Sequence, residues 1–318
     1  MDLGLALALA HILCGAMPSQ THEGAPGPGT AGRLWVVSAP LGNPDDLSPR
    51  ARSVLAVADL VLAEDTRSAR RILSLIGSRR SDQLVVSCFD ANESSRALEA
   101  VERIAAGQNV ALLSEAGTPL VSDPGFRVVR AVIEAGLVVQ PVPGPSAILA
   151  ALVGSGQSAE RFTFLGFPPR KSGARRRLFE TLRSHPFTLI LYESPMRTAD
   201  TLRDLAAVLG QQRQACVARE LTKTHEEFVR GTLAALCERY RADRPLGEVT
   251  LVVSGADPDI EQRQDALSDE GLAARAAELL ATGQSARDVT DELSVRSSRP
   301  RREIYAIVTA VGSTSRPT

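Results

Sequence analysis

Apolar residues in the first half of the chain form short continuous runs separated by segments with helical spacing. Runs that suit buried strands occur at 33–40, 60–66, 84–90, 110–117 and 137–145. Helical spacing occurs between them, most clearly at 48–59, 93–107 and 125–136. The first of these begins with Ser48 and Pro49, a common helix start signal. Strands that alternate with helices predict a parallel α/β sheet, which we assign to a domain over residues 33–145.

The pattern changes in the second half of the chain. Strand-like segments follow one another with few helices between them, at 162–169, 187–195, 215–222, 225–233 and 247–255. They predict a second, more mixed α/β domain over residues 146–256, with the boundary at the turn PVPGPS. Residues 257–318 hold three short helical patterns and predict a small appended module, which we expect to bind RNA.

Composition narrows the class of protein. The chain has 318 residues, 44% of them hydrophobic, which is long for one hydrophobic core. Its formal net charge is −1, so a surface for nucleic acid has to be local. Four cysteines without a C-x-x-C pair indicate reduced thiols in the cytoplasm. Residues 1–32 lack the positive start of a signal peptide, and we expect a disordered extension or an upstream start codon, with no membrane segment.

Unusual loops follow all five strands of the first domain: APLGNPDD, AEDTR, FDANE, SEAGTPLVSDPG and PGPSA. Ligands of open parallel sheets bind beyond the carboxyl ends of the strands, so these loops predict one cleft. Glycine lets backbone approach a ligand, and proline stiffens it. We find no phosphate loop, no metal-spaced histidines and no serine nucleophile elbow. The loops carry acids instead, which suit a cationic ligand, either a sulfonium or a divalent metal: Glu64, Asp65, Asp90, Glu93, Glu115 and Asp123.

Seven motifs in one order carry a resemblance: LWVVSAPLGNPDDLSPRA, AEDTR, SEAGTPLVSDPGFRVVRA, VVQPVPGPSAILAAL, FLGFPPRK, LYESPMR and ARELTKTHEEFVRGTL. They resemble the small-subunit ribosomal RNA methyltransferase I family of the tetrapyrrole-methylase superfamily. The resemblance implies a two-domain α/β tetrapyrrole-methylase-like fold with S-adenosyl-L-methionine in a cleft between the domains. It also implies a homodimer that methylates the ribose 2′-oxygen of a decoding-region cytidine in the 16S rRNA of the small ribosomal subunit.

The resemblance assigns cofactor contacts to three of the loops and to one tyrosine: Pro40, Leu41, Gly42, Ser114, Glu115, Ala116, Gly117, Thr118, Pro119, Pro143, Gly144, Ser146 and Tyr192. Asp123 joins this set, although its place before Pro124 suits a helix cap equally well. Glu115 stands where the family usually has Asp. The family's two histidines in the third loop are absent here, so no mechanism can require them.

A general base is expected because a ribose hydroxyl is a poor nucleophile, and such a base contributes about 10²- to 10⁴-fold. Glu93 is our first candidate and Asp90 the second, with Glu64 or Asp65 as alternatives. Lys223, within ARELTK, is included among the catalytic residues. Glu93 also opens a helix, where an acid that only complements the helix dipole is an equal interpretation.

Basic residues after FPP and in the tail predict phosphate contacts, although a solvated helix face is the simpler interpretation. With polar residues of AEDTR and ARELT they form the RNA-binding set: Glu64, Asp65, Arg67, Lys171, Arg175, Arg176, Arg177, Arg219, Glu220, Arg301 and Arg302. Three alternatives stay open. These are a tetrapyrrole or other small-molecule methyltransferase, a catalytically impaired RNA- or ribosome-binding protein, and a pyrophosphohydrolase or metal enzyme.

Overall fold

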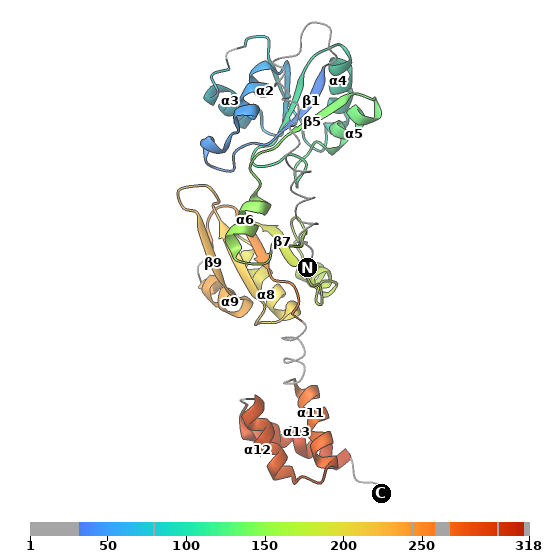
Figure 1. Cartoon of the computed structure of the whole chain (residues 1–318), viewed down its shortest axis with the longest axis vertical. Coiled ribbons are helices and arrows are strands. Elements are labelled where there is room, and N and C mark those ends of the chain that lie inside the picture. Colours follow the sequence, from blue (N-terminus) through green and yellow to red (C-terminus); the bar gives the residue numbers. More distant parts are fainter. Residues whose placement is uncertain (1–31, 79, 243–244, 258–267, 298, 315–318) are drawn as a thin grey trace, which may run out of the picture. The chain divides into compact units, whose positions relative to one another are not determined.

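A computed structural model describes residues 32–78, 80–242, 245–257, 268–297 and 299–314. The chain divides into two compact units (Figure 1). Unit 1 comprises Met1–Ala150 with Leu221–Thr224, and unit 2 comprises Ala151–Glu220 with His225–Thr318. Apart from residue 32, the predicted N-terminal extension lies outside the described residues. Within the described residues, no helix has the length and apolar character needed to cross a membrane.

Unit 1 is built on a five-stranded parallel sheet with the strand order β3-β2-β4-β1-β5. The strands are β1 (Arg33–Val37), β2 (Leu60–Ala63), β3 (Leu84–Ser87), β4 (Val110–Leu113) and β5 (Val138–Val142). The connecting helices are η1 (Pro44–Asp46), α2 (Pro49–Val57), α3 (Thr66–Leu75), α4 (Glu93–Ala105) and α5 (Phe126–Glu134). The predicted parallel α/β sheet is confirmed.

Helices cover both faces of this sheet because side chains alternate along each strand. Trp35 of β1 points to the face where Leu55 of α2 and Leu73 of α3 pack. Its neighbour Leu34 points to the opposite face, where residues of α4 and α5 such as Ala100 and Val128 pack. The chain therefore leaves β1 toward one face of the sheet and leaves β4 toward the other.

Unit 2 contains a second five-stranded sheet, in the order β6-β7-β10-β8-β9. The strands are β6 (Phe162–Phe164), β7 (Thr188–Glu193), β8 (Gln214–Arg219), β9 (Glu227–Thr232) and β10 (Val249–Val253). Only β6 and β7 pair in parallel, and the remaining pairs are antiparallel. The mixed sheet is as expected, but the scarcity of helices was wrong. The helices here are α7 (Ser172–Glu180), α8 (Thr198–Leu209) and α9 (Leu233–Ala242), whereas α6 (Ala147–Ser155) passes from unit 1 to unit 2.

The helices of unit 2 were missed because their apolar faces are short. Leu202, Leu205 and Leu209 of α8 pack on Leu189 and Leu191 of β7, so burial against the sheet stabilises a helix that spacing alone leaves ambiguous.

The predicted helical stretch at the end of the chain is confirmed. It consists of α11 (Asp269–Ala281), α12 (Ala286–Ser297) and α13 (Arg301–Thr314). Ser268 caps α11 by accepting a hydrogen bond from the backbone N–H of Gly271. Leu272, Leu293 and Ile304, one from each helix, belong to one apolar cluster. These helices therefore share a core of their own.

Candidate functional site

The loops after β1 and β4 are joined by a pair of backbone hydrogen bonds. Ala39 N–H donates to Gly117 O over 2.8 Å, and Gly117 N–H donates to Ala39 O over 3.0 Å. β1 and β4 are neighbours whose chains leave toward opposite faces of the sheet, which is the position where open α/β sheets bind ligands. Ser114 Oγ, itself buried, donates to the same Gly117 carbonyl over 2.7 Å. Gly117 has φ of +72°, a conformation that glycine adopts without steric cost.

The loop after β5 is attached to this pair through Thr118. Thr118 Oγ1 donates to Pro145 O over 3.0 Å and accepts from Ser38 Oγ over 3.3 Å. A side chain on Gly144 would lie 2.9 Å from Ser38 Cβ, so backbone and side chain are tightly apposed there. Three loops that are far apart in sequence thus form one interlocked edge, which we call the carboxyl edge (residues 38–46, 114–125 and 143–147).

The predicted cofactor residues of unit 1 all belong to the loops of the carboxyl edge: Pro40, Leu41, Gly42, Ser114, Glu115, Ala116, Gly117, Thr118, Pro119, Asp123, Pro143, Gly144 and Ser146. Tyr192, the remaining member, lies near the end of β7 in unit 2. Sequence reasoning missed Ser38, whose hydroxyl helps to join two of these loops. A hydroxyl residue directly after a strand was the available signal.

The loop after β4 holds strained backbone. Leu120 and Ser122 have φ of +71° and +69°, a left-handed conformation that side chains with a Cβ disfavour. Such positions persist only where the surrounding structure holds them, and they concentrate at functional sites.

A short segment of ARELTKT also belongs to unit 1, namely Leu221–Thr224. Asn43 N–H donates to Thr222 Oγ1 over 3.1 Å, and Thr222 has φ of +64°. A side chain on Gly42 would overlap the methylene groups of Lys223. Gly42 is therefore required where Lys223 crosses the loop after β1, and Lys223 lies at the carboxyl edge.

Acidic side chains at the ends of β2 and β4 influence one another. Partial burial, followed by the charges of Glu115, Asp90 and Asp65, raises the pKa of Glu64. Burial and then the charges of Glu64 and Glu115 raise the pKa of Asp123 to about 7. The edge therefore accumulates negative charge, and Asp123 changes protonation near neutral pH. Among the described residues, no His, Cys, Asp or Glu cluster of three or more has an arrangement that would hold a metal ion.

Asp65 has a different environment from Asp123. It caps α3 by accepting a hydrogen bond from Arg67 N–H, and the Arg67 guanidinium donates to the same carboxylate over 2.7 Å. These hydrogen bonds lower the pKa of Asp65 to about 2. A carboxylate that is so stabilised is a weak proton acceptor, and Arg67 pairs with it rather than standing alone.

Glu93, the first candidate for the base, is buried and occupied by the start of α5. Its Oε1 accepts hydrogen bonds from Gly125 N–H over 2.9 Å and Arg127 N–H over 2.7 Å. Glu93, at the start of α4, therefore caps the N-terminus of α5 by accepting from two of its backbone N–H groups. This geometry favours a structural role for Glu93. Gly125 is the N-cap of α5 and no side chain of its own loop caps it, so the alternative of a capping role for Asp123 was wrong.

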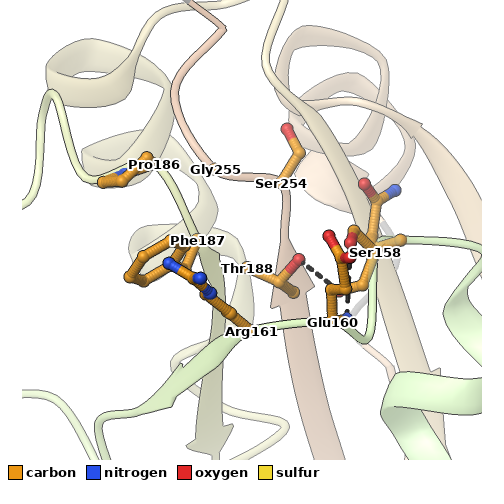
Figure 2. Close-up of a pocket in the computed structure, with 9 residues that line it drawn as sticks. Ser158, Glu160, Arg161, Pro186, Phe187, Thr188, Ser254 and Gly255 are labelled. Atoms are coloured by element: carbon orange, nitrogen blue, oxygen red, sulfur yellow. Dashed lines mark hydrogen bonds between the residues drawn. The ribbon is translucent and has the colours of Figure 1, made fainter. Parts of the chain in front are cut away.

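A cavity of about 390 Å³ lies in unit 2, near the start of β7 (Figure 2). The Arg161 guanidinium lies 5.3 Å from the centroid of the Phe187 ring, and Thr188 Oγ1 donates to Ser158 O over 2.7 Å. Tyr192 lies toward the other end of β7, and no residue that the sequence predicted for a site lines this cavity.

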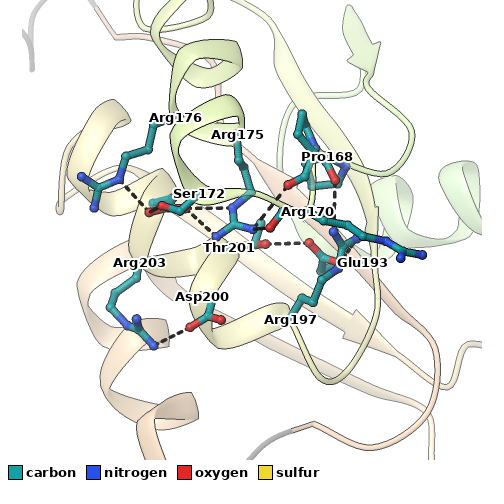
Figure 3. A network of polar contacts seen from close by, with 12 residues as sticks. Pro168, Arg170, Ser172, Arg175, Arg176, Glu193, Arg197, Asp200, Thr201 and Arg203 are labelled. Atoms are coloured by element: carbon teal, nitrogen blue, oxygen red, sulfur yellow. Dashed lines mark hydrogen bonds and ion pairs between the residues drawn. The ribbon is translucent and has the colours of Figure 1, made fainter.

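Arg175 was predicted to contact RNA, and the structure contradicts this (Figure 3). Its side chain is 4% exposed and forms an ion pair with Asp204 over 2.5 Å. Its guanidinium also donates to the carbonyls of Pro169 and Arg170. A buried guanidinium with internal partners has no donor to offer a phosphate, and it instead attaches the loop before α7 to α8.

The other predicted RNA residues in unit 2 divide into paired and exposed side chains. Arg176 also pairs with Asp204 over 2.7 Å but is half exposed, and Arg219 pairs with Glu227 over 2.6 Å. Lys171 and Arg177 are exposed on and beside α7. In the C-terminal helices, Arg301 pairs with Asp291 over 2.5 Å and Arg302 is exposed.

Comparison with known proteins gives the family. A model of the tetrapyrrole (corrin/porphyrin) methylases matches residues 33–237. The chain belongs to the tetrapyrrole methylase family. Curated relatives named ribosomal RNA small subunit methyltransferase I include one from Synechocystis sp., 40% identical over 276 residues, which covers 87% of this chain and 97% of the relative. The relative of that name from Mycobacterium tuberculosis is 42% identical over 280 residues, covering 88% and 95%.

Solved methylases share the fold of this family member at low identity. The methyltransferase CobJ gives a TM-score of 0.55 at 20% identity, covering 71% of this chain and 95% of that one. Uroporphyrin-III C-methyltransferase from Thermus thermophilus, in complex with S-adenosyl homocysteine, gives 0.52 at 20% identity, covering 70% and 97%. At such identity the likeness shows the fold alone, which agrees with the tetrapyrrole-methylase-like fold expected from the motifs.

Asp123 makes stability depend on pH. Its pKa of about 7 in the folded protein exceeds its ordinary value of 3.8, so its ionisation favours unfolding. The contribution of its protonated form is complete below about pH 4 and is lost as pH rises to about 7. We expect Asp123→Asn to be more stable than wild type above pH 7, by about 1 kcal/mol because the group is partly solvated. Urea unfolding at a series of pH values measures this difference, with Glu134→Gln as an exposed control. The same dependence of unfolding free energy on pH in Asp123→Asn and wild type would contradict the prediction.

The Arg175–Asp204 pair offers a matched test on one helix. Asp204→Ala leaves Arg175 buried without a counter-charge, so we expect a loss of about 3 kcal/mol in the free energy of unfolding. Asp200→Ala, also on α8, breaks an exposed pair with Arg203 and should cost about 0.5 kcal/mol or less. Chemical denaturation of both variants measures these losses. Similar losses of unfolding free energy in the two variants would show that the buried pair has no special structural role.

Proposed function

We propose that the chain transfers a methyl group from S-adenosyl-L-methionine to the ribose 2′-oxygen of a decoding-region cytidine in 16S rRNA. A methyltransferase is the coarser conclusion, supported by the family and by the names of the curated relatives. The main support for an rRNA substrate is the 40% to 42% identity, over 87% to 88% of this chain, to relatives named ribosomal RNA small subunit methyltransferase I. We also propose a homodimer that acts on the small ribosomal subunit in the cytoplasm.

The acidic side chains and the loop backbone of the carboxyl edge suit this cofactor. Glu115 of this edge and the neighbouring Glu64, after β2, supply the negative potential that a positively charged sulfonium requires. The backbone of Ser114–Pro119 and of Pro143–Ser146, fixed by Thr118, would hold the uncharged parts. Bound there, S-adenosyl-L-methionine would supply an electrophilic methyl group. The backbone near Tyr192, in unit 2, stays a proposed contact.

Among the acids of unit 1, Asp123 is the best candidate for the general base. As the oxygen–methyl bond forms and the sulfur–methyl bond breaks, the proton of the 2′-hydroxyl needs an acceptor. A carboxylate with a pKa of about 7 is matched to that task near neutral pH, whereas Asp65 is too weak a base and Glu93 is bound to α5. Asp90, exposed after β3, stays the alternative base, and Lys223 stays a proposed catalytic residue beside Gly42.

Methylation of isolated small subunits tests the function. Incubation of the purified protein with S-adenosyl-L-methionine and subunits that lack the modification should add one methyl group to one decoding-region cytidine, located by mass spectrometry of nuclease fragments. Asp123→Asn should lower the rate at saturating cofactor by about 10²-fold or more, while Glu93→Gln keeps most of it. Loss of rate in Glu93→Gln alone would return the base to Glu93, and modification of a base or of no RNA would contradict the proposed reaction.

A further inference from the structure

Three aromatic rings gather where β6 and β7 end in unit 2. Phe164 and Tyr192 meet edge to face with ring centroids 4.9 Å apart, and Phe167 lies 5.6 Å from Tyr192 at a tilt of 56°. Phe167 is 57% exposed, although it belongs to this cluster. We call Phe164, Phe167 and Tyr192 the aromatic shelf. An exposed ring that packs against a neighbouring ring offers its free face to a planar ligand.

Hydrogen bonds to β7 hold the backbone just before Phe167. Leu165 N–H donates to Ile190 O over 2.9 Å, and Tyr192 N–H donates to Gly166 O over 3.0 Å, so the pairing of the two strands continues beyond β6. Gly166 has φ of +63°, which turns the chain at this point. Phe167 is therefore attached to the sheet and does not belong to a long free loop.

The segment after Phe167 is anchored to a buried acid (Figure 3). Pro168 O accepts a hydrogen bond from the Arg197 guanidinium over 3.2 Å. Arg197 in turn pairs with Glu193, whose side chain is fully buried and also accepts from Thr201 Oγ1 over 2.6 Å. With its position fixed in advance, the ring loses little freedom when a ligand binds.

Exposed cationic side chains follow the shelf in sequence. Arg170, Lys171 and Arg177 are exposed, within ten residues of Phe167. Aromatic faces combined with lysine and arginine are the features that bind single-stranded nucleic acid, through base stacking and phosphate contacts. The same cations disfavour the sulfonium of the cofactor, for which the acids of unit 1 are suited.

We propose that the aromatic shelf stacks an unpaired nucleobase of the RNA substrate, while Arg170 and Lys171 contact its phosphates. The proposal rests on the proposed function and adds to it that the substrate is recognised as a single strand. Phe167 is then a substrate-positioning residue, because its ring holds a base and takes no part in the bonds that form and break.

Binding of a decoding-region RNA hairpin to the full-length protein tests the shelf. Phe167→Ala should weaken binding about tenfold, and Phe167→Trp should preserve it. The slope of affinity against salt concentration should stay that of wild type in Phe167→Ala but decrease in Arg170→Ala, because only the second change removes a phosphate contact. Phe162→Ala is the matched control, since Phe162, in β6, is also an exposed phenylalanine and lies outside the shelf.

A hairpin that carries 2-aminopurine at successive unpaired positions locates the stacked base. One position should lose fluorescence on binding to wild type and keep it with Phe167→Ala. Calorimetry with S-adenosylhomocysteine should give equal affinities for wild type and Phe167→Ala.

Each alternative result overturns a distinct claim. Weaker S-adenosylhomocysteine binding with unchanged RNA binding would assign the ring to the adenine of the cofactor. If Phe167→Ala binds the hairpin as tightly as wild type while wild type methylates small subunits, the role of the shelf is contradicted and the proposed function stands. A wild-type protein that neither binds the hairpin nor methylates small subunits would contradict both proposals.

Discussion

The backbone pair between Ala39 and Gly117 is the constraint on which the candidate site depends. It joins two loops whose chains then leave toward opposite faces of the sheet, and each loop is attached to a further element. Thr118 extends the connection to the loop after β5, and Asn43 extends it to Thr222. Because backbone amides and carbonyls make the pair, replacing the Ala39 side chain removes none of its donors or acceptors. Gly42 and Gly144 are needed where a Cβ would overlap neighbouring groups, and Gly117 is needed for its φ of +72°.

Local clusters of opposite charge, one in each unit, match two different ligands. Acids that raise one another's pKa lie in unit 1, and exposed arginine and lysine follow the aromatic shelf in unit 2. A cationic cofactor and an anionic RNA would each meet charges of opposite sign. The net charge of −1 does not reveal these local clusters, which is why overall charge was a poor guide to function.

The sequence predicted the features that depend on neighbouring residues, namely strands and a helix cap. Continuous apolar runs separated by helical segments predicted the five parallel strands, and Ser48 caps α2 by accepting a hydrogen bond from Ala51 N–H, as its position before Pro49 predicted. Long-range partners could not be predicted from spacing. Glu93 caps a helix that begins 33 residues later in the chain (126 − 93), and Arg175 points inward because Asp204 lies on the next helix. The left-handed conformations of Leu120 and Ser122 have no signature in residue type, since the surrounding loops impose them.

Hydrogen–deuterium exchange with and without S-adenosylhomocysteine tests most directly whether the carboxyl edge holds the cofactor. The structure predicts slower exchange in residues 38–46, 114–125 and 143–147 of the full-length protein when the ligand is bound. It predicts no change at residues 157–161 and 186–188, which contribute to the cavity near the start of β7. Protection at those two segments, with the carboxyl edge unchanged, would contradict the account.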